Sequence, residues 1–157
     1  MNRAESYNLK SCGAFTLVEF LVVTAIIGII AGTGVSFLKS FQPDIQLNGV
    51  ARNLLSDLRY AQQLSVAEQI EYCLQFPVNF PQDRKYKIFQ CGQSQSVKEV
   101  SLSEEIADLT IDPSLTDNEV RYNPYGAVKE STDITLENTK GNTKTIKVEP
   151  SGFVKIK

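Results

Sequence analysis

A single carboxylate, Glu19, lies inside an otherwise uncharged run from Phe15 to Leu38. An ionised carboxylate at the centre of a bilayer costs on the order of 2–3 kcal/mol, and less toward the surface. Glu19 therefore either lies at the level of the lipid headgroups or pairs with a positive charge. Thr16 adds a hydroxyl at the same end of the run. Any further role of Glu19 depends on the sequence around it.

The residue types exclude several kinds of catalytic and metal site. The chain contains no His, so His-based zinc sites, Ser-His-Asp triads and Cys-His dyads are excluded. Gly32-Thr33-Gly34 lies in the apolar run and does not form a phosphate loop, and no D-x-D-x-D-G calcium loop is present. The acidic residues show no spacing typical of catalysis. We therefore expect no enzymatic activity, no cofactor and no metal.

The apolar run predicts a long helix. Its 24 residues would span about 36 Å as a helix, enough to cross a hydrocarbon core of about 30 Å. The residues before the run include two bases, Arg3 and Lys10, and one acid, Glu5. This excess of positive charge favours a cytoplasmic N-terminus and a translocated remainder. A secretory signal cut near Ala31–Gly34 is the alternative, although the run is longer than a typical signal core. A lipoprotein site at Cys12 is disfavoured because no apolar run precedes it.

The residues around Glu19 carry a resemblance to a known family. The segment from Cys12 to Val23, CGAFTLVEFLVV, resembles the cleavage and assembly motif of type IV prepilins and type II secretion pseudopilins, and the match extends through Ala31. The resemblance implies that a prepilin peptidase removes residues 1–14 by cutting between Ala14 and Phe15, and that the new amino group of Phe15 is methylated. The family usually has Gly before the cut. A cut after Gly13 would place Glu19 sixth in the mature chain instead of fifth.

The same resemblance implies how the subunit assembles. Glu19 of one subunit would pair with the Phe15 amine of a neighbour, so that neither charge is left bare in an apolar medium, and Thr16 would add a hydrogen bond. The implied partners are other pilin or pseudopilin subunits, the prepilin peptidase and the inner-membrane assembly platform. The implied location is the bacterial inner membrane, crossed once, with the C-terminal domain outside the cytoplasm and filament-associated after assembly. Gly28 and Gly32 either allow close helix packing or weaken the helix locally.

A second helix is predicted after the apolar run. Pro43 predicts a kink or break at Gln42, with Asp44 as a cap. From Ile45 to about Gln69, apolar residues recur every three or four positions, with Arg52, Asp57 and Arg59 on the other side. This pattern predicts an amphipathic helix packed on a sheet. The stretch from Leu47 to Ala61 and the C-terminal residues from Ser151 to Ile156 also resemble the GspH/FimT-like minor pseudopilins.

The remaining residues are typical of strands and turns. We expect strands at 70–76, 86–91, 97–102, 109–112, 120–122, 133–137, 145–149 and 153–156. The predicted fold is α+β and pilin-like: a long N-terminal helix, half transmembrane and half amphipathic, packed on an antiparallel sheet. The predicted parts are a cleaved leader at 1–14, an assembly helix at 15–42 and an extracytoplasmic domain at 43–157.

Two cysteines fall on consecutive predicted strands. If Cys73 lies opposite Cys91 in a hairpin, Phe76 faces Ile88 and the loop centres on Pro81-Gln82. Outside the cytoplasm such a pair can be oxidised to a disulfide. The alternative is two small buried residues on a sheet.

Charge is unevenly distributed, although the net charge is only −2. Residues from Glu99 to Glu119 include seven acids and no base. This segment is expected to be solvated, with a calcium or partner surface as the alternative. The C-terminal lysines could contact DNA phosphates, which makes a DNA-binding minor pilin for DNA uptake the alternative function. The GspH/FimT-like minor pilins that serve DNA uptake have a C-terminal motif rich in Arg. This chain has Phe153 and Lys155 where Arg would be expected, so nucleic acid is a disfavoured partner. The lysines are Lys129, Lys144, Lys147, Lys155 and Lys157.

Overall fold

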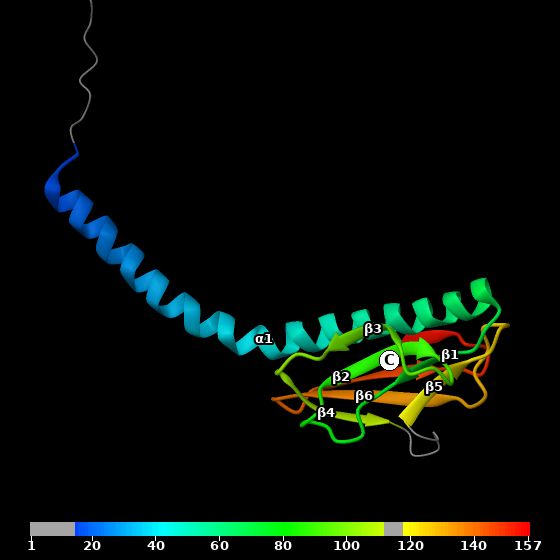
Figure 1. The fold of residues 1–157 in the computed structure, drawn as a ribbon. Helices are drawn as coiled ribbons and strands as arrows, with labels where there is room; N and C mark the ends of the chain where they lie inside the picture. Colours follow the sequence, from blue (N-terminus) through cyan, green and yellow to red (C-terminus); the bar gives the residue numbers. More distant parts are fainter. Residues whose placement is uncertain (1–14, 112–117) are drawn as a thin grey trace, which may run out of the picture. The chain divides into compact units, whose positions relative to one another are not determined.

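The computed structural model describes residues 15–111 and 118–157, apart from the side chains of residues 33–38. In these ranges one helix, α1, precedes eight strands, β1 to β8 (Figure 1). The chain divides into two compact units, one ending at Ser40 and the other running from Phe41 to Lys157. The predicted leader, with Cys12 and Ala14, and the acidic residues Asp112 and Asp117 lie outside the described residues.

Helix α1 runs from Leu17 to Glu68 and contains Pro43. Of the predicted kink or break at Gln42, the break is therefore wrong, because the helix continues through Pro43 and Asp44 lies inside it instead of capping a new one. A proline in a helix interior costs about 3 kcal/mol because it removes a hydrogen bond and clashes with the preceding turn. Burial of the Pro43 ring and hydrogen bonds to the Asp44 side chain help to offset this cost.

The first unit consists of the start of α1. Its described side chains, at 15–32 and 39–40, are all exposed. Within the described part of the chain, no helix combines the length and the hydropathy that a membrane span needs.

The second unit contains two antiparallel sheets. The first sheet has the order β3-β2-β1-β5 and the second the order β4-β6-β7-β8. All eight predicted strands are present, with ends displaced by at most three residues. Their bounds are β1 Tyr72–Gln75, β2 Lys85–Gln90, β3 Ser96–Ser101, β4 Ile106–Ile111, β5 Glu119–Tyr122, β6 Thr132–Asn138, β7 Thr143–Val148 and β8 Val154–Ile156.

The core forms where the C-terminal half of α1 lies along the strands (Figure 1). One face of the helix supplies buried residues at a spacing of three or four, which is the amphipathic pattern predicted. These residues are Leu47, Ala51, Leu54, Leu58 and Ala61. The first sheet adds Leu74, Tyr86 and Ile88, and the second adds Ile134, Leu136 and Ile146. A single core therefore joins the helix to both sheets.

Asp57 is buried, contrary to its predicted place on the outer side of the helix. Its carboxylate accepts hydrogen bonds from the Tyr86 hydroxyl, at 2.7 Å, and from Lys98 Nζ, at 2.5 Å. Position 57 lies next to Leu58 and three residues from Leu54, so it belongs to the buried face. Burial, and then the bond to Asp57, raise the pKa of Tyr86 well above its ordinary value.

Two glycine turns meet beneath the C-terminal end of α1. Gln62 Nε2 donates to the Gly126 carbonyl oxygen at 2.8 Å. A Cβ at Gly152 would lie 1.9 Å from that same oxygen, and Gly152 has φ +80°. Both the backbone conformation and the close approach therefore require glycine at position 152.

Two buried tyrosines provide a matched test of the Asp57 contact. The Tyr122 hydroxyl is buried and has no hydrogen-bond partner among the described residues. We expect Tyr86→Phe to lower the free energy of unfolding by about 1.5–3 kcal/mol, because Asp57 loses a charge-assisted hydrogen bond. Tyr122→Phe should leave it unchanged or raise it. Urea unfolding of the two variants measures both effects, and equal losses would contradict the assigned contact.

Candidate processing and assembly site

The start of α1 is organised by Thr16. The Thr16 Oγ1 atom accepts a hydrogen bond from the Glu19 backbone N–H at 3.2 Å, and the Thr16 carbonyl accepts one from Phe20 at 3.2 Å. Because the helix begins at Leu17, Thr16 is its N-cap and Glu19 is the third helical residue. Thr-x-x-Glu is the spacing of a capping box. The Thr16 hydroxyl oxygen thus caps its own helix, and its predicted hydrogen bond between subunits stays a prediction.

Glu19 lies where a carboxylate suits the helix. The N-terminal end of a helix carries partial positive charge, which favours an acidic residue in the first turn. The Glu19 side chain is exposed and forms no ion pair within residues 15–111 and 118–157. Phe15, the predicted first mature residue, immediately precedes the N-cap. The carboxylate is therefore available to a positive group beyond the described chain, whereas Ala14 lies outside the described residues.

Asp44 connects α1 to the turn between β6 and β7. Its carboxylate accepts hydrogen bonds from Asn142 Nδ2 at 2.6 Å and Asn138 Nδ2 at 2.8 Å, and Lys140 Nζ lies 3.9 Å away. These groups, Asn142 first, hold the pKa of Asp44 below its usual value. The predicted strands at 133–137 and 145–149 leave this turn between them, but the sequence pattern did not identify its contact with the helix.

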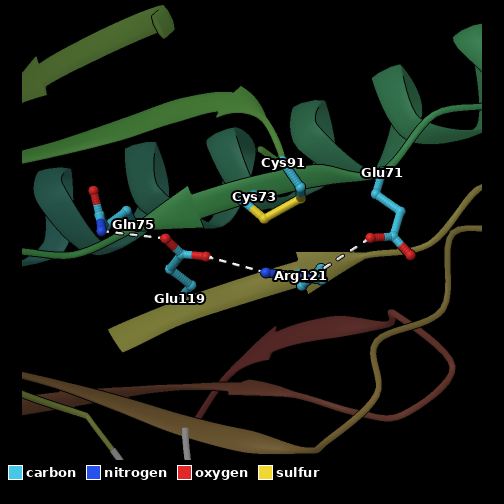
Figure 2. The surroundings of a disulfide bond; sticks show 6 residues. All are labelled: Glu71, Cys73, Gln75, Cys91, Glu119 and Arg121. Carbon is cyan, nitrogen blue, oxygen red and sulfur yellow. Dashed lines mark hydrogen bonds and ion pairs between the residues drawn. A yellow bond between two sulfur atoms is a disulfide. The ribbon is translucent and has the colours of Figure 1, made fainter. Parts of the chain in front are cut away.

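A disulfide joins Cys73 to Cys91, with 5.2 Å between the Cα atoms (Figure 2). The predicted register is wrong by two residues, because Cys73 lies opposite Phe89 and Leu74 opposite Ile88. Strand β2 ends at Gln90, so Cys91 begins the following turn and the disulfide links the strands diagonally.

Polar side chains from β1, from the residue before it and from β5 lie near the disulfide (Figure 2). Arg121 lies between Glu71 and Glu119, at 3.7 Å from each, and Gln75 Nε2 donates to Glu119 at 3.2 Å (Figure 2). Arg121 offsets one of the two carboxylates, so this group of side chains keeps a net negative charge. In the described parts of the chain, no three His, Cys, Asp or Glu side chains come together as a metal site requires.

The C-terminal lysines have acidic neighbours. Lys155 Nζ lies 2.8 Å from Glu149, and Lys157 Nζ lies 3.1 Å from Asp133. The Lys155 ammonium lowers the pKa of Glu149. The two residues singled out for DNA contact are thus each beside a carboxylate, which weakens attraction to phosphate.

Comparison with known proteins identifies the N-terminal motif. Residues 9–35 match the family model described as a prokaryotic N-terminal methylation motif. This range contains Ala14, Phe15, Thr16 and Glu19. None of the curated proteins matches the sequence.

Solved structures share the fold. The type IV minor pilin FimU of Pseudomonas aeruginosa aligns with a TM-score of 0.60 and 12% identity, over 74% of this chain and 92% of that one. The minor pseudopilin EpsH from the Type 2 Secretion System of Vibrio cholerae aligns with a TM-score of 0.58 and 10% identity, over 71% and 96%. At these identities the likeness concerns the fold. The predicted α+β, pilin-like fold is confirmed, as is the resemblance to pilins and pseudopilins.

The Asp44 contact predicts a pH dependence of stability. Because folding lowers the Asp44 pKa, its contribution is present above the unfolded value, near 3.8, and is lost as pH falls through the folded pKa. We expect Asp44→Asn to be less stable than the parent at pH 6, and the difference to shrink toward pH 3. Urea unfolding at both pH values measures this difference. A difference independent of pH would contradict a role for the ionised carboxylate.

Proposed function

We propose that this chain, a type IV pilin-like protein by its N-terminal methylation motif and its fold, is a structural minor subunit of a type IV pilus or a type II secretion pseudopilus. The observation that carries the proposal is the start of α1. There Thr16 caps the helix and Glu19 is the only charge in an exposed apolar segment. No enzymatic step by this chain is part of the proposal.

Processing would complete the site. A prepilin peptidase cuts between Ala14 and Phe15, which creates an ammonium group directly before the N-cap. An ammonium and a carboxylate are each costly in an apolar medium unless they are paired. Glu19 of one subunit therefore pairs with the Phe15 amine of a neighbour. This contact sets the axial register of the two subunits.

Before assembly, residues 15–38 anchor the chain in the inner membrane with a single span. The proposal is supported by the length of this apolar run, about 36 Å as a helix, and by the single charge at its start. The Cys73–Cys91 disulfide fits a domain outside the cytoplasm. The partners are other pilin-type subunits, the peptidase that cuts the leader and the assembly platform of the inner membrane.

DNA capture is not favoured as a second function. Lys155 and Lys157 are each beside a carboxylate. Residues 44–157 contain 13 bases against 16 acids, so this part of the chain is acidic overall. The structural role therefore stands alone.

The cleavage position can be read directly from the mature protein. We expect mass spectrometry of the membrane-extracted chain to show loss of residues 1–14 and addition of one methyl group at Phe15. The reason is that only this cut makes Glu19 the fifth residue. A mature chain that begins near Thr33 would instead establish a secretory signal and overturn the proposal.

The pairing of Glu19 can be tested by substitution. Glu19→Val should leave membrane insertion intact, because it removes a charge from an apolar helix. It should reduce incorporation into the sheared filament fraction, because the neighbour's amine loses its partner. Glu130→Gln, which removes an exposed carboxylate from the second unit, is the matched control. Equal incorporation of the two variants would exclude the pairing.

A further inference from the structure

The start of α1 leaves Phe15 and Thr16 outside the helix. Both residues are non-helical, and the helix begins at Leu17. The Thr16 hydroxyl oxygen accepts a hydrogen bond from the Glu19 backbone N–H. An N-cap of this kind fixes the residue at which a helix starts, because the capping residue itself has non-helical backbone angles. The proposed cut between Ala14 and Phe15 therefore falls two residues before the helix.

A peptide bond inside a helix is a poor substrate for an endopeptidase. Its N–H and carbonyl groups are engaged in the hydrogen bonds of the helix, whereas a partner that binds an extended chain uses these same groups. The rate of cleavage then follows the fraction of molecules in which the bond is open. Processing of this chain adds water across the Ala14–Phe15 bond and yields the Ala14 carboxylate and the Phe15 ammonium. This bond must therefore stay outside the helix until it is cut.

Without the Thr16 cap, the sequence favours a helix that starts earlier. Backbone groups in an apolar medium are costly unless they are hydrogen-bonded, so a helix at the edge of a bilayer gains from extension. Gly13 opposes extension, but alanine, present at position 14, is the best helix former. Ser11 is the next residue upstream whose type caps helices. A helix capped at Ser11 would include Phe15 and enclose the bond that has to be cut.

We propose that Thr16 is a positioning residue for the cleavage: it starts the helix at Leu17 and so holds the bond between Ala14 and Phe15 in a form that a prepilin peptidase can bind. This inference rests on the proposed function, because it concerns the removal of residues 1–14. Thr16 acts through the backbone of its own helix and not through contact with the reacting atoms. The capping oxygen, and not the shape of the side chain, is therefore the feature that determines the rate.

Substitutions at position 16 separate capping from side-chain shape. In the full-length chain, inserted in membranes that contain a prepilin peptidase, Thr16→Val keeps the shape of threonine but removes the cap, and cleavage should slow about fivefold. Thr16→Asn has a different shape but caps a helix well, so its rate should stay within about twofold of the parent rate. Equal slowing of the two variants would mean that the peptidase reads the threonine side chain itself. Normal cleavage of Thr16→Val would mean that no cap is needed, and either result would overturn the inference.

Thr24 provides a matched control in the same helix. Its hydroxyl donates to the carbonyl oxygens of Phe20 and Leu21, at 3.0 Å each, and lies away from the start of the helix. Thr24→Val therefore removes a hydroxyl without removing the cap, and cleavage should keep the parent rate. A loss equal to that of Thr16→Val would show that any lost hydroxyl slows cleavage, which would overturn the inference.

A second substitution tests whether the slow variant has a longer helix. Ser11→Ala, combined with Thr16→Val, should restore cleavage to within about twofold of the parent rate, because the extended helix then loses its own cap. A role of Thr16 in stability alone gives no such rescue, so a double variant as slow as Thr16→Val would overturn the inference. A parent chain that is not cut between Ala14 and Phe15 would overturn the proposed function itself.

Discussion

A carboxylate buried between a helix and a sheet constrains how this domain can be built. Asp57 must keep both Tyr86 and Lys98, because a buried charge that loses its partners costs several kcal/mol. These partners lie on β2 and β3, which are adjacent, so the helix cannot rotate or slide by one turn against the first sheet. Asp44 makes a comparable contact with the second sheet through Asn138. Two acidic side chains therefore set the helix against both sheets.

Local sequence patterns were sufficient to locate the elements. The apolar spacing of the helix and the short alternating strands between turn residues are local features, and each strand was predicted close to its place. The division into two sheets was not predicted, because β4 pairs with β6 and not with its chain neighbours. Likewise, the Cys73–Cys91 register depends on where β2 ends, which a pattern of alternation leaves open by two residues.

The candidate site was predictable to the extent that it is local. Thr16 and Glu19 stand three residues apart, and that spacing alone indicates a capped helix start. The contacts of Asp44 and Asp57 join residues far apart in the chain, and an acidic residue in an amphipathic helix is ordinarily placed on the solvent side. Pro43 is the opposite case. Local preference predicted a kink or break there, whereas the helix continues through Pro43 and the next residue, Asp44, is hydrogen-bonded to the turn between β6 and β7.

The contacts beneath the end of α1 constrain the order in which the domain can fold. Arg59 donates a hydrogen bond to the carbonyl of Val154, 95 residues further along the chain. Gln62 donates to the Gly126 carbonyl, which lies so close to position 152 that only glycine fits there. The helix is synthesised first, yet its apolar face cannot be fully covered until the last strand has been delivered. During synthesis, the helix is therefore complete before the domain that covers it. Between synthesis of the helix and synthesis of the last strand, the uncovered apolar face leaves the chain open to aggregation and proteolysis.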